Sequence, residues 1–312
     1  MKILAVQSRM GIGDTVIFLP FIKALSKKFN SPISILVKEN SKANQYLHQT
    51  KYIDKILILE RDNKTNNRHD GFFGIFNLAT DLKKHKFDKI FIFNSSLRYN
   101  LVARLAGIKS INQYPLFKSK DNIVLSAKVF TEAVINKVVS TEPNLIIKEI
   151  HNDLDKNFKH ICLGISASGP TKRWDISNYI KLAEKITEKK KCKFYIAGGE
   201  KDYDLIKKFK NSKVGRDSFS FEKLSIRETL QIISDCTLYI GNDTGWAHIS
   251  VALKVNALTI FCDSPVLAYG RYSTRMFTIE PEGERNTTTH DTLGKDKISF
   301  EKVLSQSIKL LN

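Results

Sequence analysis

Cysteine is scarce in this sequence, which argues against a cross-linked or zinc-stabilised small domain. The chain has four cysteines among 312 residues, and none of them stands at the spacing of a metal-ligand pair. Three lie within apolar runs, where a small buried thiol is the ordinary interpretation. This cysteine usage fits a reducing cytoplasm.

Long apolar runs are missing as well. No stretch approaches the roughly 20 residues that a helix needs to cross a bilayer, and the apolar start at residues 1–6 is too short for a signal peptide. The sequence also lacks a repeat of fixed period and a low-complexity block. We therefore expect a globular, cytoplasmic protein without a transmembrane segment, whose membrane contact is at most peripheral.

Acidic residues are too few to balance the basic ones. There are 50 Lys and Arg against 32 Asp and Glu, a formal charge of +18. This excess indicates an anionic partner, such as nucleic acid, a phospholipid surface or a phosphorylated substrate. A Lys-, Asn- and Ile-rich composition inherited from an AT-rich genome explains it equally well. Because the charge is spread over both halves and forms no Arg-rich arm, we expect no nucleic-acid partner.

Short β-branched runs alternate with amphipathic helical patterns, which predicts parallel α/β units. The length favours two domains, at residues 1–155 and 156–312, joined by a polar linker at 151–155. It remains open whether the last helix packs back on the first domain. The expected strands are residues 2–6, 32–37, 55–59, 89–93, 160–165, 192–197, 237–240 and 257–261; the expected helices are 15–29, 97–106, 175–189, 225–234, 245–253 and 300–311.

Ligands of open α/β sheets bind at the carboxyl ends of the strands, and the first such position carries the residues 11–14, GIGD. The glycine pair allows a tight turn and close approach of a ligand to the backbone. Asp14 is either a helix-capping aspartate, worth about 0.5–2 kcal/mol, or a general base at the mouth of a cleft. Pro20 falls within the predicted helix and is expected to kink it.

A second polar loop follows the first strand of the second half. Residues 166–174 combine small residues, hydroxyls and two cations, among them Ser168, Thr171 and Lys172. Hydroxyl and backbone donors with a lysine charge suit a phosphate group. The alternative is an ordinary polar loop with Trp174 as an aromatic plug.

Two further strand ends carry polar residues. Residues 241–248 open a helix whose free N–H groups attract an anion, and His248 shares a face with Thr244 because residues four apart do so. That histidine is as readily structural as functional. Residues 197–202 form another loop, which is either a plain turn or one whose carboxylate holds a ribose.

Residues 60–70 are a polar stretch that we expect to be a mobile loop.

With these segments placed, the sequence resembles the heptosyltransferases, the bacterial glycosyltransferases of the lipopolysaccharide core. Three segments carry the resemblance: GDTVIFLP from Gly13, TKRW at residues 171–174, and NDTGWAH at residues 242–248. Residues 95–105, with Arg98 and Arg104, also resemble a helix of this family. The resemblance runs from the first strand to about Tyr272.

The resemblance implies a GT-B fold, with two Rossmann-like domains facing each other across a cleft, and an inverting, metal-independent transfer from a nucleotide-diphosphate sugar. The first domain would bind the acceptor through residues such as Gly13 and Arg98, with Asp14 as catalytic base. The second would bind the donor, best taken as ADP-heptose. By the family pattern the donor contacts are Ser168, Thr171 and Lys172 for the diphosphate, Asp202 for the ribose, Leu224 for the base, Asp243, Thr244 and Gly245 for the phosphate end, and His248 for the sugar.

No cofactor or metal is expected, since Asp243 lacks a second acid two positions away. The acceptor would be a glycolipid of the lipopolysaccharide core or a relative of it at the inner face of the inner membrane. One departure concerns the loop after residue 261, which reads Cys262-Asp263-Ser264-Pro265 where the family usually shows Gly-Pro-Thr. That loop would face the donor, so the sugar stays open.

Other functions remain to be weighed. A nicotinamide-dependent Rossmann enzyme needs a third glycine where Val16 stands and an acid after the second strand, where Glu39 is a loose match. A non-catalytic binder of polyanions would explain the charge but not the phosphate-suited strand ends. A transferase of the same fold with another nucleotide sugar or acceptor fits every motif.

Overall fold

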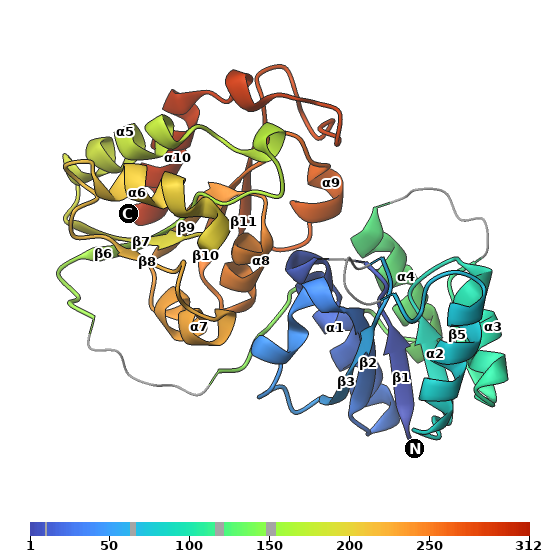
Figure 1. The fold of residues 1–312 in the computed structure, drawn as a ribbon. Helices are drawn as coiled ribbons and strands as arrows, with labels where there is room; N and C mark the ends of the chain where they lie inside the picture. Colours follow the sequence, from blue (N-terminus) through green and yellow to red (C-terminus); the bar gives the residue numbers. More distant parts are fainter. Residues whose placement is uncertain (10, 63–66, 116–121, 148–153) are drawn as a thin grey trace. The chain divides into compact units, whose positions relative to one another are not determined.

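The computed structural model describes residues 1–9, 11–62, 67–115, 122–147 and 154–312. The chain divides into two compact units, Met1–Pro143 and Asn144–Asn312, which we call the first and second units (Figure 1). This division lies before the boundary placed at residue 155. Residues 151–153 of the predicted linker lie outside the described residues.

Within the described residues, the sheet of the first unit is parallel, with strand order β3-β2-β1-β4-β5. Its central strand is buried along its whole length, as expected when helices cover both faces of a parallel sheet. The strands are β1 (Ile3–Val6), β2 (Ile33–Lys38), β3 (Ile53–Leu59), β4 (Lys89–Ile92) and β5 (Ser110–Gln113).

Helices form two layers around this sheet (Figure 1). One layer pairs α2 (Phe73–Lys83) with α3 (Leu97–Leu105), and its core includes Leu4 and Val6 of β1. The other pairs α1 (Ile12–Phe29) with α4 (Ile123–Ile135). Helix α1 continues past Pro20 without a break in the assigned helix.

Sequence patterns located most of these elements but missed α2, β5 and α4. Helix α4 lies in a segment for which we predicted no helix or strand, and exposed phenylalanines at the start of α2 obscure its amphipathic period. Helix α3 ends within one residue of the predicted range 97–106, and Gly107 next adopts a left-handed conformation with φ of 78°.

The second unit also has a parallel sheet, with strand order β11-β10-β9-β6-β7-β8 among the described residues. Gly164 pairs with Gly241 where β6 and β9 end, and a Cβ on either would collide with the Tyr239 hydroxyl. The close approach of these strand ends therefore requires glycine. The strands are β6 (Lys159–Gly164), β7 (Cys192–Ala197), β8 (Phe219–Ser220), β9 (Leu238–Asn242), β10 (Asn256–Ile260) and β11 (Met276–Ile279).

The helices of the second unit follow the predicted periods, with α6 and α9 as additions. Ser225 caps α7, and Glu228 completes a capping box. The helices are α5 (Ile176–Thr187), α6 (Tyr203–Lys210), α7 (Ile226–Ser234), α8 (Gly245–Ala252), α9 (Val266–Tyr269) and α10 (Phe300–Leu311). Short 3₁₀ turns occur at Glu39–Ser41, Ala43–Gln45, Pro170–Lys172, Glu200–Asp202 and Lys295–Lys297.

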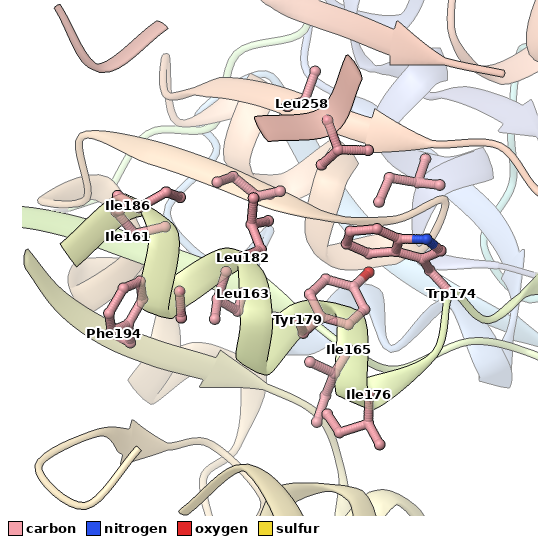
Figure 2. Packing of buried hydrophobic residues seen from close by; sticks show 14 of the residues in the cluster. Ile161, Leu163, Ile165, Trp174, Ile176, Tyr179, Leu182, Ile186, Phe194 and Leu258 are labelled. Carbon is pink, nitrogen blue, oxygen red and sulfur yellow. The ribbon is translucent and has the colours of Figure 1, made fainter. Parts of the chain in front are cut away.

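The core of the second unit lies between its sheet and α5 (Figure 2). Tyr179, Leu182 and Ile186 of α5 pack on strand residues such as Leu163. Helix α10 contributes Val303 and Leu311 to the same core and packs against α5. The last helix is therefore part of the second unit. In the described part of the chain, no helix combines the length and hydrophobicity of a membrane span.

Candidate functional site

The polar loops of the second unit gather at one edge of its sheet. Because the strands are parallel, the segments after β6, β7, β9 and β10 all leave from their carboxyl ends. These segments contain the predicted donor residues, and hydrogen bonds and ion pairs join segments that are far apart in the sequence.

Asn242, the last residue of β9, links two of these segments. Its Oδ1 accepts a hydrogen bond from the Trp174 N–H at 2.9 Å, and its Nδ2 donates to the carbonyls of Ile165 and Ser166 at 3.1 and 3.2 Å. The side chain is fully buried. Replacing these bonds would leave buried polar groups without partners, so Asn242 fixes both ends of the loop at residues 166–174.

Within that loop, Trp174 is buried in the core, whereas the polar residues reach solvent. Trp174 is 1% exposed, packs edge-to-face on Tyr179 at 5.0 Å and stacks on Phe300. Trp174 is therefore the aromatic plug considered from the sequence. It anchors the loop in the core and leaves the polar residues of the loop available to a ligand. Ser168 and Thr171 are exposed, and Lys172, in a 3₁₀ turn, is half-buried.

Asp202 is tied to the same loop. One carboxylate oxygen accepts a hydrogen bond from the Gly199 N–H at 3.0 Å, and the other lies 3.5 Å from the Arg173 guanidinium. Asp202, which was predicted to bind the ribose, thus contacts two protein groups in this structure. Leu224 lies apart from these contacts, half-buried in the turn before α7, where its N–H donates to the Phe221 carbonyl.

Asp243 and His248, at the start of α8, lie within contact distance of each other. The imidazole of His248 is 2% exposed; its Nε2 lies 3.3 Å from Asp243 Oδ1, and its Nδ1 lies 2.7 Å from the Tyr272 hydroxyl. His248 therefore orients Asp243, whereas the sequence suggested a pairing with Thr244. Thr244 is the N-cap and Gly245 the first residue of α8, so the unsatisfied N–H groups of the first turn lie at this edge.

The unusual segment after β10 packs against the phosphate-suited loop. Burial favours a higher pKa for Asp263, but the Leu293 N–H, the Thr171 hydroxyl and the Lys172 charge together lower that pKa below its ordinary value. The Leu293 N–H donates to Asp263 at 2.9 Å. A carboxylate thus lies beside the two residues, Thr171 and Lys172, that were predicted to contact the diphosphate.

The first unit has its own polar edge, after β1 and β4. Asp14, in the first turn of α1, accepts a hydrogen bond from the Gly11 N–H at 2.9 Å and lies 3.6 Å from Arg9. The side chain is 14% exposed. Asp14 is therefore a capping residue in this structure, and it retains access to solvent. Gly13 is buried in the same turn.

Arg98 joins neighbouring segments of this edge. Its guanidinium donates to the carbonyl of Gly71 at 2.8 Å and to that of His69. Nearby, Asn94 donates to the Ser8 hydroxyl at 2.8 Å, so the loops after β1 and β4 are also linked. An acceptor contact by Arg98 stays a prediction, since the structure gives this side chain a backbone-anchoring role.

The polar stretch at residues 60–70 is anchored at its described ends. Glu60 and His69 exchange hydrogen bonds through the Glu60 N–H and carbonyl, at 3.0 and 2.9 Å. Residues 63–66 lie outside the described residues. The expected mobility of this loop therefore concerns a part that the structure does not describe.

Several site residues had no clear sequence signal. Arg9 and Tyr272 lie outside the quoted motifs and Arg173 lies within TKRW, and the local sequence does not indicate the partner of any of the three. Asp263 was noticed only as part of a loop that departs from the family pattern, and its contact with the loop at residues 166–174 was not predicted. Among the described residues, no group of three or more His, Cys, Asp or Glu side chains is arranged to hold a metal ion.

The two units, each a parallel α/β sheet with polar loops at the carboxyl ends of its strands, have the architecture of the GT-B fold. The structure is similar to the ADP-heptose lipopolysaccharide heptosyltransferase II of Escherichia coli, with a TM-score of 0.73, 16% identity and coverage of 100% of this chain and 98% of that one. It is also similar to a family 9 glycosyltransferase of Veillonella parvula, with a TM-score of 0.79, 18% identity and coverage of 99% and 97%.

Sequence comparison identifies the family. The model of glycosyltransferase family 9 (heptosyltransferase) matches residues 122–294. The lipooligosaccharide heptosyltransferase 2 of Campylobacter jejuni is 27% identical over 249 residues, 74% of this chain and 76% of that protein. The chain belongs to glycosyltransferase family 9, the heptosyltransferase family, and is a glycosyltransferase.

Proposed function

We propose that this enzyme transfers a heptose from ADP-heptose to a lipopolysaccharide-core or related glycolipid acceptor, with inversion and without a metal ion. The names of the C. jejuni and E. coli proteins support the sugar and the pathway. The observation that carries the proposal is the gathering of Thr171, Lys172 and the start of α8 at one edge of the second unit, fixed by Asn242.

The second unit would bind the donor. Ser168, Thr171 and Lys172 offer hydroxyl donors and a positive charge to the diphosphate, and the first-turn N–H groups of α8 add further donors. As the bond between the anomeric carbon and the diphosphate oxygen breaks, its electron pair goes to the diphosphate. Positive groups placed in advance stabilise that developing charge, which removes the need for a metal ion.

The first unit would bind the acceptor and supply the base. An acceptor hydroxyl attacks the anomeric carbon from the face opposite the diphosphate, and the Asp14 carboxylate takes its proton. Arg9 and the Gly11 N–H orient that carboxylate. A positioned general base contributes roughly 10²–10⁴-fold to the rate. Gly13 and Arg98 remain the predicted acceptor residues, and the cytoplasmic face of the membrane is the proposed place of action.

A panel of nucleotide sugars tests the donor. At about 100 times its Kd, a ligand stabilises the folded state by about 2.7 kcal/mol, which a thermal-unfolding assay detects. We expect ADP-heptose and ADP to raise the melting temperature more than UDP- or GDP-linked sugars do. Stabilisation by a UDP-sugar instead would favour the same-fold transferase with another donor, and stabilisation by NAD alone would favour the nicotinamide enzyme.

Lys172→Ala sharpens this test. It should weaken ADP binding measured by calorimetry, because it removes a charge from the diphosphate position. Lys213→Ala, which removes an exposed lysine after α6, is the matched control and should leave the Kd unchanged. Equal affinities of the two variants would remove Lys172 from the donor site.

A further inference from the structure

The layer of α2 and α3 presents large apolar side chains to solvent. Phe73 is 78% exposed and Phe72 67% exposed, at the start of α2. The exposed side chains of this layer, which we call the α2–α3 apolar surface, are Phe72, Phe73, Phe76, Leu97, Leu101 and Leu105. A concentration of this kind on one pair of helices, unlike isolated exposed residues, marks an interaction surface.

The members of this surface form two groups on neighbouring helices. Phe72 contacts Phe73 and Phe76 edge-to-face, with ring centroids 6.0 and 5.4 Å apart. Leu97, Leu101 and Leu105 follow one another at four-residue spacing and so share one face of α3. Helices α2 and α3 pack side by side (Figure 1).

Hydrogen bonds tie the aromatic start of α2 to α3. Arg98, next to Leu97, donates to the carbonyl of Gly71, next to Phe72. Asp81 accepts from Arg68 at 3.1 Å and lies 3.2 Å from His69, which holds the preceding segment against α2. The phenylalanines are therefore presented on an anchored scaffold.

The charge around this surface is positive. Helices α2 and α3 carry three basic residues, Lys83, Arg98 and Arg104, against one acidic residue, Asp81. Helix α3 contains Arg98 and Arg104 and no acid, and exposed Arg104 stands between Leu101 and Leu105. Each Lys or Arg near an anionic leaflet adds to the electrostatic attraction. Apolar side chains interleaved with cations match a bilayer of acidic phospholipid.

One end of this surface, formed by the aromatic start of α2 and Leu97, lies at the edge of the first sheet that contains Asp14. Both the aromatic start of α2 and Leu97 follow strand ends of the parallel sheet, as does the loop before Asp14. The Asn94–Ser8 hydrogen bond connects the loop before α3 with the loop before α1. A bilayer docked on this surface would bring an embedded acceptor to the edge proposed to bind it.

We infer that the α2–α3 apolar surface docks this enzyme on an anionic phospholipid bilayer, with the phenylalanines in the interfacial layer and the cations at the headgroups. The advantage of that location rests on the proposed function, because it supplies a glycolipid acceptor. The binding itself does not depend on catalysis and can be measured without donor or acceptor.

Vesicle co-sedimentation tests the inference on the full chain. We expect binding to phosphatidylglycerol-containing vesicles, weaker binding to pure phosphatidylcholine, and at least a tenfold loss of affinity in the double variant Phe72→Ser with Phe73→Ser. The matched control replaces Leu125 and Val129, which are 55% and 53% exposed on α4, with serine. That control should bind as the wild type does. An equal loss in both variants, or equal binding to both lipids, would overturn the inference.

A second variant tests the inference even if the double serine variant fails to fold. Phe73→Trp keeps an aromatic side chain at the most exposed of these positions, and its fluorescence should shift to shorter wavelength when anionic vesicles are added. No shift would contradict docking through this surface. If light scattering instead shows a dimer that the serine variant dissociates, the surface binds a second copy and the bilayer assignment is wrong. Retained ADP binding in every variant separates this outcome from failure of the proposed function.

Discussion

Asp14 has the contacts of a helix-capping residue, and its role as catalytic base stays a prediction. It caps α1 through the Gly11 N–H and pairs with Arg9, yet part of its carboxylate remains accessible. A helix-capping role and a base role therefore do not exclude each other. A carboxylate oriented by neighbouring donors is also better placed for proton transfer than a mobile one.

Asp14→Asn separates the two roles. The amide oxygen can still accept from Gly11, so the unfolding free energy should change by less than about 1 kcal/mol. Turnover should fall roughly 10²–10⁴-fold because an amide cannot take the acceptor proton. Steady-state transfer kinetics and urea unfolding of the same preparation measure both. Near-normal turnover would disprove the base assignment.

His248 shows the limit of spacing arguments for single residues. Its four-residue distance from Thr244 suggested a shared ligand face, whereas the structure pairs its ring with Asp243 and Tyr272. Tyr272 is 24 residues away in the sequence, so the local sequence pattern could not predict this contact. A direct contact between His248 and the donor sugar stays a prediction.

At the scale of elements, local periodicity predicted the helices that have one continuous apolar face. Helices α5, α7 and α10 were predicted from such stripes, and each buries that face in the second unit. Helix α2 was missed because its phenylalanines face solvent instead of the core. The residues that hid this helix from the sequence are the ones we assign to membrane docking.

Asp81 holds the segment before α2, and its contribution should depend on pH. The Arg68 hydrogen bond, opposed in part by burial, lowers the pKa of Asp81 well below its usual range. A lowered pKa stabilises the fold above the unfolded-state value of about 3.9, and this stabilisation is lost as pH falls toward the folded-state pKa. Asp81→Asn should therefore lower the unfolding free energy by about 1 kcal/mol at pH 7.

Urea unfolding at pH 7 and pH 3 checks this expectation. The difference between Asp81→Asn and wild type should shrink at pH 3. Glu188→Gln, which breaks the exposed Lys185–Glu188 pair on α5, is the control and should cost less than about 0.5 kcal/mol at either pH. A difference for Asp81→Asn that is constant with pH would mean that packing, not charge, is responsible.

At the scale of the whole molecule, each unit has its own sheet and core. The proposed donor residues all lie in the second unit. Residues 144–312 expressed alone should therefore fold and bind ADP within about tenfold of the full chain, a difference of at most 1.4 kcal/mol. Calorimetry on both proteins measures this. If the isolated second unit folds and shows no ADP binding, the donor site needs residues of the first unit.

The sequence by itself determined that the chain is α/β, where most strands and helices begin and end, and that small and charged residues follow the strands. These properties depend on local hydrophobic period and turn chemistry, which neighbouring residues encode. Tertiary structure alone decided which loops meet. Asn242 with Trp174, Arg173 with Asp202 and Asp263 beside Lys172 are pairs far apart in sequence. They meet because strand order sets which carboxyl ends are neighbours, and local patterns do not encode that order.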